Sequence, residues 1–461
     1  MARAGREIKI GYANETLANY FIPIVLSLGA LFALGLYLSS YKTVILVTSI
    51  MAFICTFQAA LRLLACLIEK PKLGIDTDPI NWPYYTALIP IFQEAHMVER
   101  LMSALDKINY PPERLEIFMI CEEVDPFTIA MVEKFLRAPF QLIIVPKGTP
   151  QTKPRALNYA LKQSKGELIT IFDAEDIPHP DQLKQAARAF LGDADIGALQ
   201  APLDYRNSNY NWITRQFSLE YCALFHVWLP FLVSANLPFP LGGTSNHVRR
   251  AALGQGWDAY NVTEDADISF RLAADGWRLG YIDRPTQEEA VETWRSWFFQ
   301  RSRWMKGFMQ TWCVHMRAPF IPKGKNGVKR FLILQLTIGL TLLNAFFHLP
   351  ILIIMGWVIL TQYLNSASIQ IPAFFIGSII VSYLAGIFIG IIGAIRAGKP
   401  KLIISAIGMP LYWVALFFPT MHALHELGRR PFFWHKTHHG VRGRVNSQTN
   451  IDTLPNYDAF G

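Results

Sequence analysis

Closely spaced carboxylates occur at two places in the middle of this 461-residue chain, where they could bind a metal ion or move a proton. The first group, Asp173-Ala-Glu175-Asp176, directly follows an apolar run that is typical of a buried strand. Carboxylates at a strand end can bind a hard divalent cation that also contacts substrate phosphates. They are about as common in a turn or helix start, here before Pro178, so this stretch alone leaves both interpretations open.

The second group is Thr263-Glu264-Asp265. One of its carboxylates could act as the general base that removes a proton from an attacking hydroxyl. A threonine followed by acidic residues is also a common helix N-cap, and a helix is predicted from Ala266 to Asp275. Taken alone, the capping interpretation is slightly favoured.

A third motif, Gln300-Arg301-Ser302-Arg303-Trp304, combines cations with an indole ring. An arginine could neutralise a departing diphosphate, and the indole face could stack on a sugar ring. In isolation, a basic and aromatic helix at a membrane surface is the favoured interpretation of this motif.

Two further stretches offer weaker signals. Lys153-Pro-Arg155 begins a predicted helix and could hold phosphate charge, or could simply be basic surface. The loop Gly242-Gly243-Thr244-Ser245-Asn246 has small side chains that would let a ligand approach the backbone, or it is only a turn. Each signal is modest, but their order along the chain is informative.

Short apolar strands alternate with helices between residues 84 and 172 and would position these motifs. The alternation predicts a parallel sheet with helices on both faces, a Rossmann-like α/β arrangement. Ligands bind beyond the carboxyl ends of the strands in such sheets, and Glu94, Glu122, Glu123 and Asp173 fall there. The predicted strands are 85–90, 115–121, 140–145 and 168–172, and the predicted helices are 97–108, 126–136 and 154–163.

Apolar runs near both ends of the chain predict membrane helices, since about 20 residues span the hydrocarbon layer. Although 52% of the residues are hydrophobic and only 17% charged, the charges gather in the middle. The predicted organisation is a polar segment 1–16, a transmembrane hairpin 17–69, a cytosolic domain 70–320, membrane helices 321–424 and a basic tail 425–461. Within the domain, helices at about 212–233 and 292–312 are expected to lie along the membrane face.

The net charge of +8 is concentrated in short basic segments beside the apolar runs, which indicates membrane orientation rather than nucleic-acid binding. The basic residues do not form one stripe, so no nucleic-acid partner is predicted. Loop charges place the middle section in the cytosol, and the last apolar run, 402–424, is interpreted as re-entrant or interfacial. The five scattered cysteines are expected to be reduced and structural.

The order of these motifs over about residues 80–310 resembles that of the membrane-embedded family 2 glycosyltransferases. These are the cellulose, hyaluronan and chitin synthase-like enzymes. The motifs are, in order, E, EE, KPRALN, DAED, GGTSN, TED and QRSRW. YNVTEDAD and QRSRWMKGFMQTW are most similar to a bacterial exopolysaccharide branch. The resemblance implies a GT-A domain between membrane helices, a nucleotide-diphosphate sugar donor, Mg or Mn, inversion at the anomeric carbon, and growth of a polysaccharide.

The resemblance also implies a role for each matching residue. It implies that Asp173, with Glu175 or Asp176, binds the metal and the diphosphate, and that Asp265, beside Thr263 and Glu264, is the catalytic base. The residues implied to bind the donor are Glu94, Glu122, Glu123, Lys153 and Asp173. Those implied to bind the acceptor and the diphosphate are Gln300, Arg303, Trp304, Gly243 and Asn246. The family's usual aspartates after the second strand are glutamates in this chain, and which acidic residue completes the metal site stays open. The stretch 434–440 loosely resembles a gating motif, although an interfacial basic tail is favoured.

The predicted function is a processive synthase in the bacterial inner membrane that elongates an exported polysaccharide, with UDP-glucose as donor. Its expected partners are the nucleotide sugar, a glycan acceptor, the bilayer and accessory export proteins. One alternative is a single-addition transferase acting on a lipid-linked or surface glycan. Another, of a different class, is a catalytically silent channel or transport subunit. The sugar, its linkage and the oligomeric state are not indicated by these residues.

Overall fold

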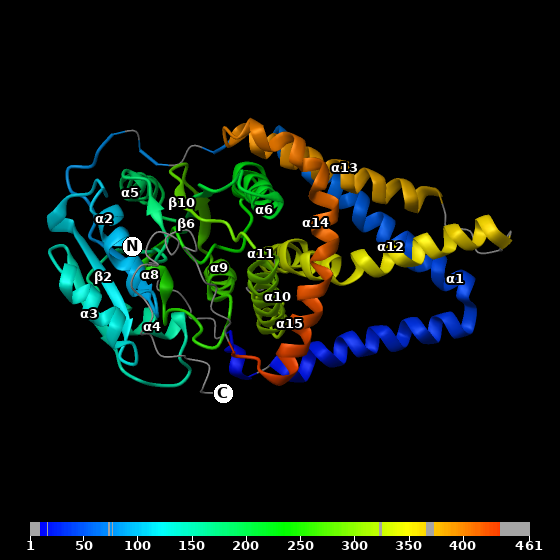
Figure 1. Ribbon diagram of the computed structural model, residues 1–461, viewed down its shortest axis with the longest axis horizontal. Helices are drawn as coiled ribbons and strands as arrows, with labels where there is room; N and C mark the ends of the chain where they lie inside the picture. Colours follow the sequence, from blue (N-terminus) through cyan, green and yellow to red (C-terminus); the bar gives the residue numbers. More distant parts are fainter. Residues whose placement is uncertain are drawn as a thin grey trace, which may run out of the picture.

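The apolar runs of the middle section form a strand and helix repeat, as predicted. The structure, a computed structural model, describes residues 10–15, 17–71, 74–75, 77–321, 325–365 and 373–433. An α/β domain lies at one end, and long helices extend from it (Figure 1). The repeat consists of β1 (Tyr85–Ile91), α2 (Val98–Leu105), β2 (Leu115–Glu122), α3 (Pro126–Phe135), β3 (Phe140–Val145), α4 (Lys153–Leu161) and β4 (Leu168–Ile171).

The main sheet has seven strands in the order β3-β2-β1-β4-β8-β6-β9, where β6 is Ile196–Gln200, β8 is Asn246–Arg249 and β9 is Arg278–Tyr281. The four predicted strands, β1 to β4, are parallel, as expected. The strand β8 was not predicted, and it runs antiparallel to both β4 and β6. The loop before β8 already lies at the carboxyl end of β4, where the amide of Ser245 donates to the carbonyl of Ile171 at 2.8 Å. Because β8 begins at the carboxyl end of β4, it pairs with β4 in the opposite direction.

Both faces of the sheet are covered at its centre, which explains why β1, β2 and β4 are buried and mainly apolar. On β1, Tyr85, Ala87 and Ile89 share a core with side chains of α2 and of α5 (Gln182–Gly192). Leu88 points to the opposite core, which also contains Ala156 of α4. The sheet is therefore a rigid platform that carries the loops at its carboxyl edge.

A second, small sheet has the order β5-β10-β7 and was not predicted. Its strands are β5 (Ile177–Pro178), β10 (Thr286–Glu288) and β7 (Leu203–Tyr205). Strands of two or three residues are too short to show an alternating pattern, so the sequence gives no signal for them. This sheet supports the chain that follows Asp173-Ala-Glu175-Asp176, since β5 begins directly after it.

The long helices differ in detail from the predicted runs. The two halves of the predicted hairpin are joined in α1 (Leu17–Leu67), whose backbone is non-helical at Ser39, where the chain reverses (Figure 1). The predicted run 331–364 is divided into α11 (Lys325–Leu334), a π-helical turn (Gln335–Gly339) and α12 (Leu340–Asn365). These are followed by α13 (Ala373–Arg396), a 3-10 segment (Pro400–Gly408), α14 (Met409–Ala415) and α15 (Phe417–Arg429).

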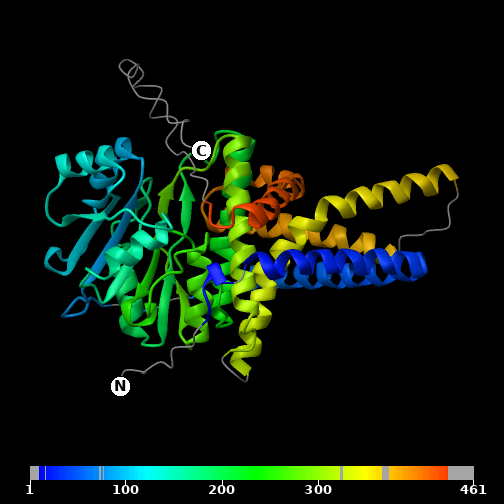
Figure 2. The same cartoon turned by 90° about the horizontal axis from the view of Figure 1, so that it is seen from below.

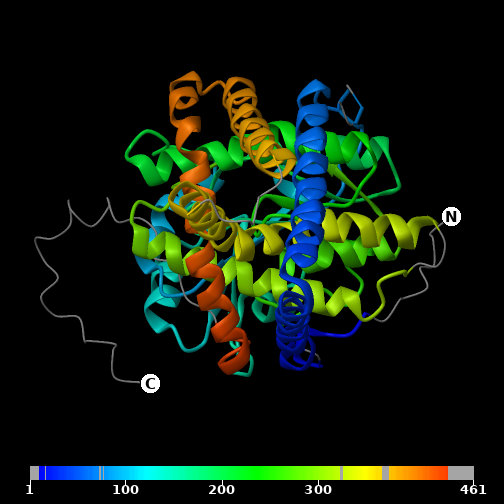
Figure 3. The same ribbon diagram turned by 90° about the vertical axis from the view of Figure 1, so that its right-hand side faces the viewer.

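In the described ranges, five helical stretches are long and apolar enough to cross a membrane: Lys42–Leu67, Trp212–Ser234, Asn326–Ile353, Ala373–Arg396 and Pro400–Arg429. The stretch from Trp212 consists of α6 (Trp212–Ala223), a π-helical turn (Leu224–Trp228) and α7 (Leu229–Ser234). Together with α10 (Trp294–Met316), α6 lies between the α/β domain and the extended helices (Figure 2). Viewed from the end of the extended helices, α6 crosses behind α1 and α13 (Figure 3).

Some predicted features lie outside the described residues. They are residues 1–9, the loop 366–372, and the stretch from 434 onward, which contains the gate-like motif. All five cysteines lie within the described ranges and are free thiols, as predicted.

Candidate active site

A large cavity lies where the carboxyl edge of the main sheet meets α9 (Glu264–Ala274), α10 and the long helices. Its volume is about 830 Å³, and it occupies the place where ligands bind in open α/β sheets. Twelve predicted site residues line it: Glu94, Glu122, Lys153, Asp173, Glu175, Gly243, Thr263, Glu264, Asp265, Gln300, Arg303 and Trp304.

Lys153, at the first position of α4, joins three segments of this site. Its ammonium group donates to Asp173 Oδ1 at 2.5 Å and to the carbonyl of Gly243 at 2.9 Å. Burial lowers the pKa of Lys153, but the charges of Asp173 and Glu264 outweigh burial and raise that pKa above its usual value. Lys153 is therefore held as a cation at the end of β4, where a phosphate group could bind.

The Gly242-Gly243 loop comes close to the second acidic motif. A Cβ atom at Gly243 would lie 3.3 Å from Asp265 Oδ2 and 3.7 Å from Lys153 Nζ. A side chain there would fill the space between the ammonium and the carboxylate. The loop thus needs a glycine because Asp265 and Lys153 face the same small volume.

The motif Thr263-Glu264-Asp265 is held in place by α10. The amide of Asn261 donates to Thr311 Oγ1 at 3.0 Å, and the backbone amide of Val262 donates to Gln310 Oε1 at 2.9 Å. Gly307 allows α10 to approach, since a Cβ atom there would lie only 2.3 Å from Thr263 Cγ2. The Thr263 side chain makes no capping bond to α9, so the capping interpretation does not explain its hydroxyl.

The two carboxyls of this motif have raised pKa values. Burial raises the pKa of Asp265 to about 6. Burial and then the charge of Asp265 raise the pKa of Glu264 to about 8. Asp265 has the lower pKa of the two, so near neutral pH it is the better candidate for the ionised proton acceptor.

Arg303 and Gln300 extend into the cavity from α10. Burial lowers the pKa of Arg303, while Asp173, Glu264 and Asp265 act in the opposite direction. The guanidinium therefore balances the acidic residues. The side-chain oxygen of Gln300 is buried and has no hydrogen-bond partner in the part of the chain that is described, so it can accept a bond from a ligand hydroxyl.

The acidic side of the cavity carries excess negative charge that suits a divalent cation. Burial and the charge of Asp173 raise the pKa of Glu175 to about 7. Burial and the charges of Asp176 and Glu175 raise the pKa of Glu288, a cavity residue of β10 that was not predicted. In the described ranges, no three His, Cys, Asp or Glu side chains are grouped closely enough to hold a metal. A cation would therefore need phosphate oxygens from a donor, as Mg²⁺ often does.

Three predicted site residues do not line the cavity. Glu123 accepts a hydrogen bond from the backbone amide of Lys147 at 2.9 Å. Asn246 belongs to β8, and its amide donates to the carbonyl of Gly242 at 2.7 Å. Asp176 is buried and accepts from the amide of Asp173 at 2.7 Å and from the hydroxyl of Thr244. In this structure, Asn246 and Asp176 hold the two loops that carry Gly243 and Asp173.

Arg301, in the third motif, has partners that the sequence did not indicate. Its guanidinium forms two bonds to Glu220 of α6, at 2.9 and 2.5 Å, and one to the hydroxyl of Tyr412 at 2.7 Å. It also lies 4.4 Å from the ring centroid of Trp304. Glu220 could have been suspected, because a carboxylate in an otherwise apolar helix needs a partner. Arg301 and Glu220 thus fix the indole ring that lines the cavity.

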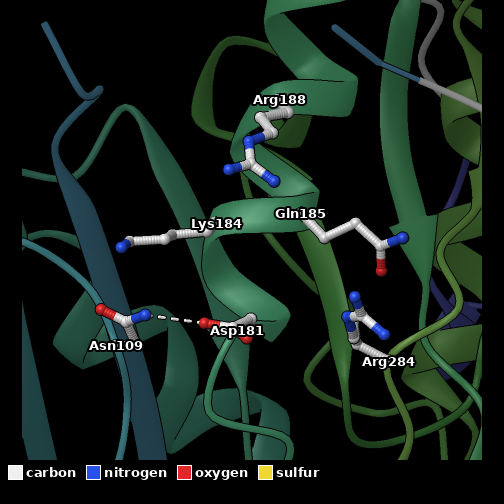
Figure 4. A pocket seen from close by; sticks show the side chains of 6 residues that line it. All are labelled: Asn109, Asp181, Lys184, Gln185, Arg188 and Arg284. Atoms are coloured by element: carbon white, nitrogen blue, oxygen red, sulfur yellow. Dashed lines mark hydrogen bonds between the residues drawn. The ribbon is translucent and has the colours of Figure 1, made fainter. Parts of the chain in front are cut away.

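A second, smaller cavity of about 210 Å³ lies at α5 (Figure 4). Asn109 donates to Asp181 Oδ1 across it at 2.7 Å, and Lys184, Arg188 and Arg284 make its wall basic. Within the described residues, its lining shares no member with the large cavity.

The mixed sheet, with a cavity at its carboxyl edge, has the arrangement of a GT-A fold. A family model described as Glycosyl transferase family 2 matches residues 86–247, and one described as Glycosyl transferase family group 2 matches residues 168–389. Residues 86–389 of this chain are therefore similar to glycosyltransferase family 2 domains.

Several characterised proteins are similar to this chain. Beta-monoglucosyldiacylglycerol synthase of Synechocystis sp. is 27% identical over 287 residues, which cover 60% of each protein. Glucomannan 4-beta-mannosyltransferase 2 of Arabidopsis thaliana is 29% identical over 264 residues, which cover 52% of this chain and 48% of that protein. The matches thus span about half to three fifths of these relatives' lengths.

A solved structure is also similar. The mannosyltransferase PcManGT from Pyrobaculum calidifontis, in complex with GDP-Man and Mn²⁺, is 17% identical with a TM-score of 0.51, covering 84% of this chain and 97% of that one. At this identity the likeness concerns the fold.

Proposed function

We propose that this chain catalyses the inverting, metal-assisted transfer of a hexosyl group from a nucleotide-diphosphate sugar to an acceptor hydroxyl at a membrane surface. The observation that carries the proposal is the convergence of Asp265, Lys153 and Arg303 on one cavity at the carboxyl edge of the sheet. UDP-glucose is the first donor to test, and a GDP-sugar is the second, because the solved relative binds GDP-Man.

The chemistry follows from the charges. Asp265 takes the proton of the acceptor hydroxyl as this group attacks the anomeric carbon from the side opposite the diphosphate. Lys153 and Arg303 stabilise the negative charge of the departing diphosphate. Asp173 and Glu175 would hold Mg²⁺ or Mn²⁺, which supplies further charge stabilisation at the same oxygens.

The wider role that we propose is elongation of a glycan by a protein of the bacterial inner membrane, with the catalytic domain in the cytosol and accessory proteins for export. The five apolar helical stretches support the membrane location. Single addition to a lipid-linked glycan is the second candidate. The name of the similar Beta-monoglucosyldiacylglycerol synthase describes a glycolipid product, and much of the cavity wall beyond Trp304 is apolar.

The experiment is an assay of the purified full chain with UDP- and GDP-sugars, in Mg²⁺, Mn²⁺ or a chelator. Nucleotide release, digestion with linkage-specific hydrolases and product length identify the donor, the linkage and processivity. Asp265→Asn is expected to lower turnover by roughly 10²- to 10⁴-fold, because the general base is lost, while donor binding persists. Asp275→Asn, at the exposed end of α9, is the control and should retain activity. Near-normal turnover of Asp265→Asn would refute the assignment of Asp265 as the general base.

A further inference from the structure

The large cavity continues from the catalytic residues into the space between the long helices. Beyond Trp304 its wall includes the apolar side chains Phe308, Leu340 and Ile389, from α10, α12 and α13. α13 packs along α1, whereas α12 packs against α14 and α15 and diverges from the other two (Figure 2). An apolar cavity between diverging helices of membrane-spanning length suits a hydrocarbon chain.

Polar and aromatic side chains interrupt this apolar wall. Gln58 and Arg62 lie one turn apart on α1, and the amide of Asn344 on α12 donates to Gln58 Oε1 at 3.3 Å. Arg62 lies over the ring of Trp413, 5.9 Å from its centroid. We name Gln58, Arg62, Asn344 and Trp413, which all line the cavity, the Arg62 cluster.

Arg62 carries a charge that the described part of the chain does not neutralise. Its guanidinium donates to the carbonyl of Ser382 at 3.3 Å and faces the indole of Trp413, but within the described ranges it pairs with no carboxylate. An ionisable residue inside a membrane span is costly and usually marks a ligand or ion site. The missing counter-ion points to a ligand with negative charge.

The position of Arg62 along α1 indicates which kind of negatively charged ligand would bind there. It lies 67 − 62 = 5 residues before the end of α1 at Leu67, which corresponds to about 7.5 Å of helix. This is near one end of the candidate span Lys42–Leu67. Lipid head groups lie at that level of a bilayer, and basic pockets between helices bind their phosphates. Arginine is well suited to this because its donors match phosphate oxygens.

From this geometry we propose, on the basis of the glycosyl transfer described above, that the acceptor is a lipid carrying a phosphate between its hydrocarbon tail and its sugar-bearing end. The phosphate binds at the Arg62 cluster. The terminal hydroxyl reaches Asp265, and the tail leaves between α12 and the α1–α13 pair. The proposal holds whether the glycan on this lipid is extended once or repeatedly.

The test compares two acceptors with the same dodecyl chain and the same terminal glucose. In one the two parts are joined by a phosphodiester, and the other is dodecyl glucoside. The full chain in nanodiscs is given an active donor, and the acceptor KM and kcat are measured for the wild type and for Arg62→Gln. Arg396→Gln is the matched control, since Arg396 also bonds carbonyls of other segments, those of Cys66 and His226, but does not line the cavity.

We expect the wild-type KM to be about ten- to a hundredfold lower for the phosphodiester acceptor, because a charge-assisted contact is lost in the glucoside. Arg62→Gln should abolish this difference by raising the KM for the phosphodiester acceptor, whereas Arg396→Gln should preserve it. Equal KM values in the wild type would overturn the proposal. So would equal losses with both acceptors in Arg62→Gln, since Arg62 would then only join helices.

Two further arms separate the remaining possibilities. Dodecyl phosphate should compete with the acceptor, and inorganic phosphate at the same concentration should not. Equal competition would mean that the site binds a soluble anion and would refute the lipid assignment. If no donor supports transfer, the proposed function fails separately. The site is then tested by thermal unfolding. Dodecyl phosphate should raise the Tm of the wild type more than dodecanol does, and the two compounds should have equal effects on the Tm of Arg62→Gln.

Discussion

The ion pair between Glu220 and Arg301 provides a sharp test of how the indole of Trp304 is positioned. Glu220→Gln keeps the shape of the side chain and removes its charge. The side chain of Arg301 is only 3% exposed and that of Glu220 is 29% exposed. After the substitution, the guanidinium stays buried among the rings of Phe217, Trp304 and Tyr412 without a counter-ion.

Breaking a buried ion pair costs about 3–5 kcal/mol. We expect about 2–3 kcal/mol for Glu220→Gln, because the carboxylate already reaches water and glutamine can still accept one hydrogen bond. The pair between Asp106 and Arg137 is the comparison, since both side chains are about 40% exposed, at 40% and 41%. Asp106→Asn should cost less than about 1 kcal/mol.

The assay combines thermal unfolding of the full chain with steady-state kinetics. Glu220→Gln should lower the Tm clearly more than Asp106→Asn, and it should impair use of the acceptor while the donor affinity is retained, because Trp304 moves with Arg301. Adding Arg301→Met to Glu220→Gln should recover part of the lost stability. Equal Tm values for Glu220→Gln and Asp106→Asn would refute this account of the pair. So would a loss of stability in the double variant that equals the sum of the losses in Glu220→Gln and Arg301→Met.

Two other predictions concern the base. Because the pKa of Asp265 is about 6 and the base must be ionised, log kcat/KM should fall as the pH drops below about 6, and a profile that stays flat through that pH would contradict the role of Asp265. Gly307→Ala should reduce kcat by roughly ten- to a hundredfold, because the new Cβ would lie 2.3 Å from Thr263 Cγ2 and displace the acidic motif. Gly377→Ala, in α13 with no atom within 4 Å of the added Cβ, should leave turnover unchanged in the same assay.

The strands β1 to β4 could be predicted because they are short, mainly apolar runs, and β1, β2 and β4 are buried along their length. β8 could not, since its direction depends on where the preceding loop lies relative to β4. The motif residues could be selected by their types and order, and twelve of them line one cavity. The sequence did not show that Asp176 and Asn246 hold loops.

Contacts between distant segments are the part that no local pattern contains. Arg301 and Glu220 are 81 residues apart, on α10 and α6, and both bond the hydroxyl of Tyr412 on α14. The Arg62 cluster likewise combines residues of α1, α12 and α14. Local periodicity predicts each of these helices, but it does not predict which faces meet.

The position of α10 explains why the site lies beside the long helices. On one side α10 holds the acidic motif, through Gln310 and Thr311. On the other side it is fixed to the C-terminal helices, because the buried ammonium of Lys306 pairs with Glu426 of α15 at 3.0 Å and the amide of Gln310 donates to the carbonyl of Pro431 at 2.8 Å. Gln310 thus contacts both parts. The sheet positions Lys153 and Asp173, whereas the placement of Asp265 depends on chain segments that follow residue 400, so the catalytic geometry is completed only when the C-terminal helices are folded against α10.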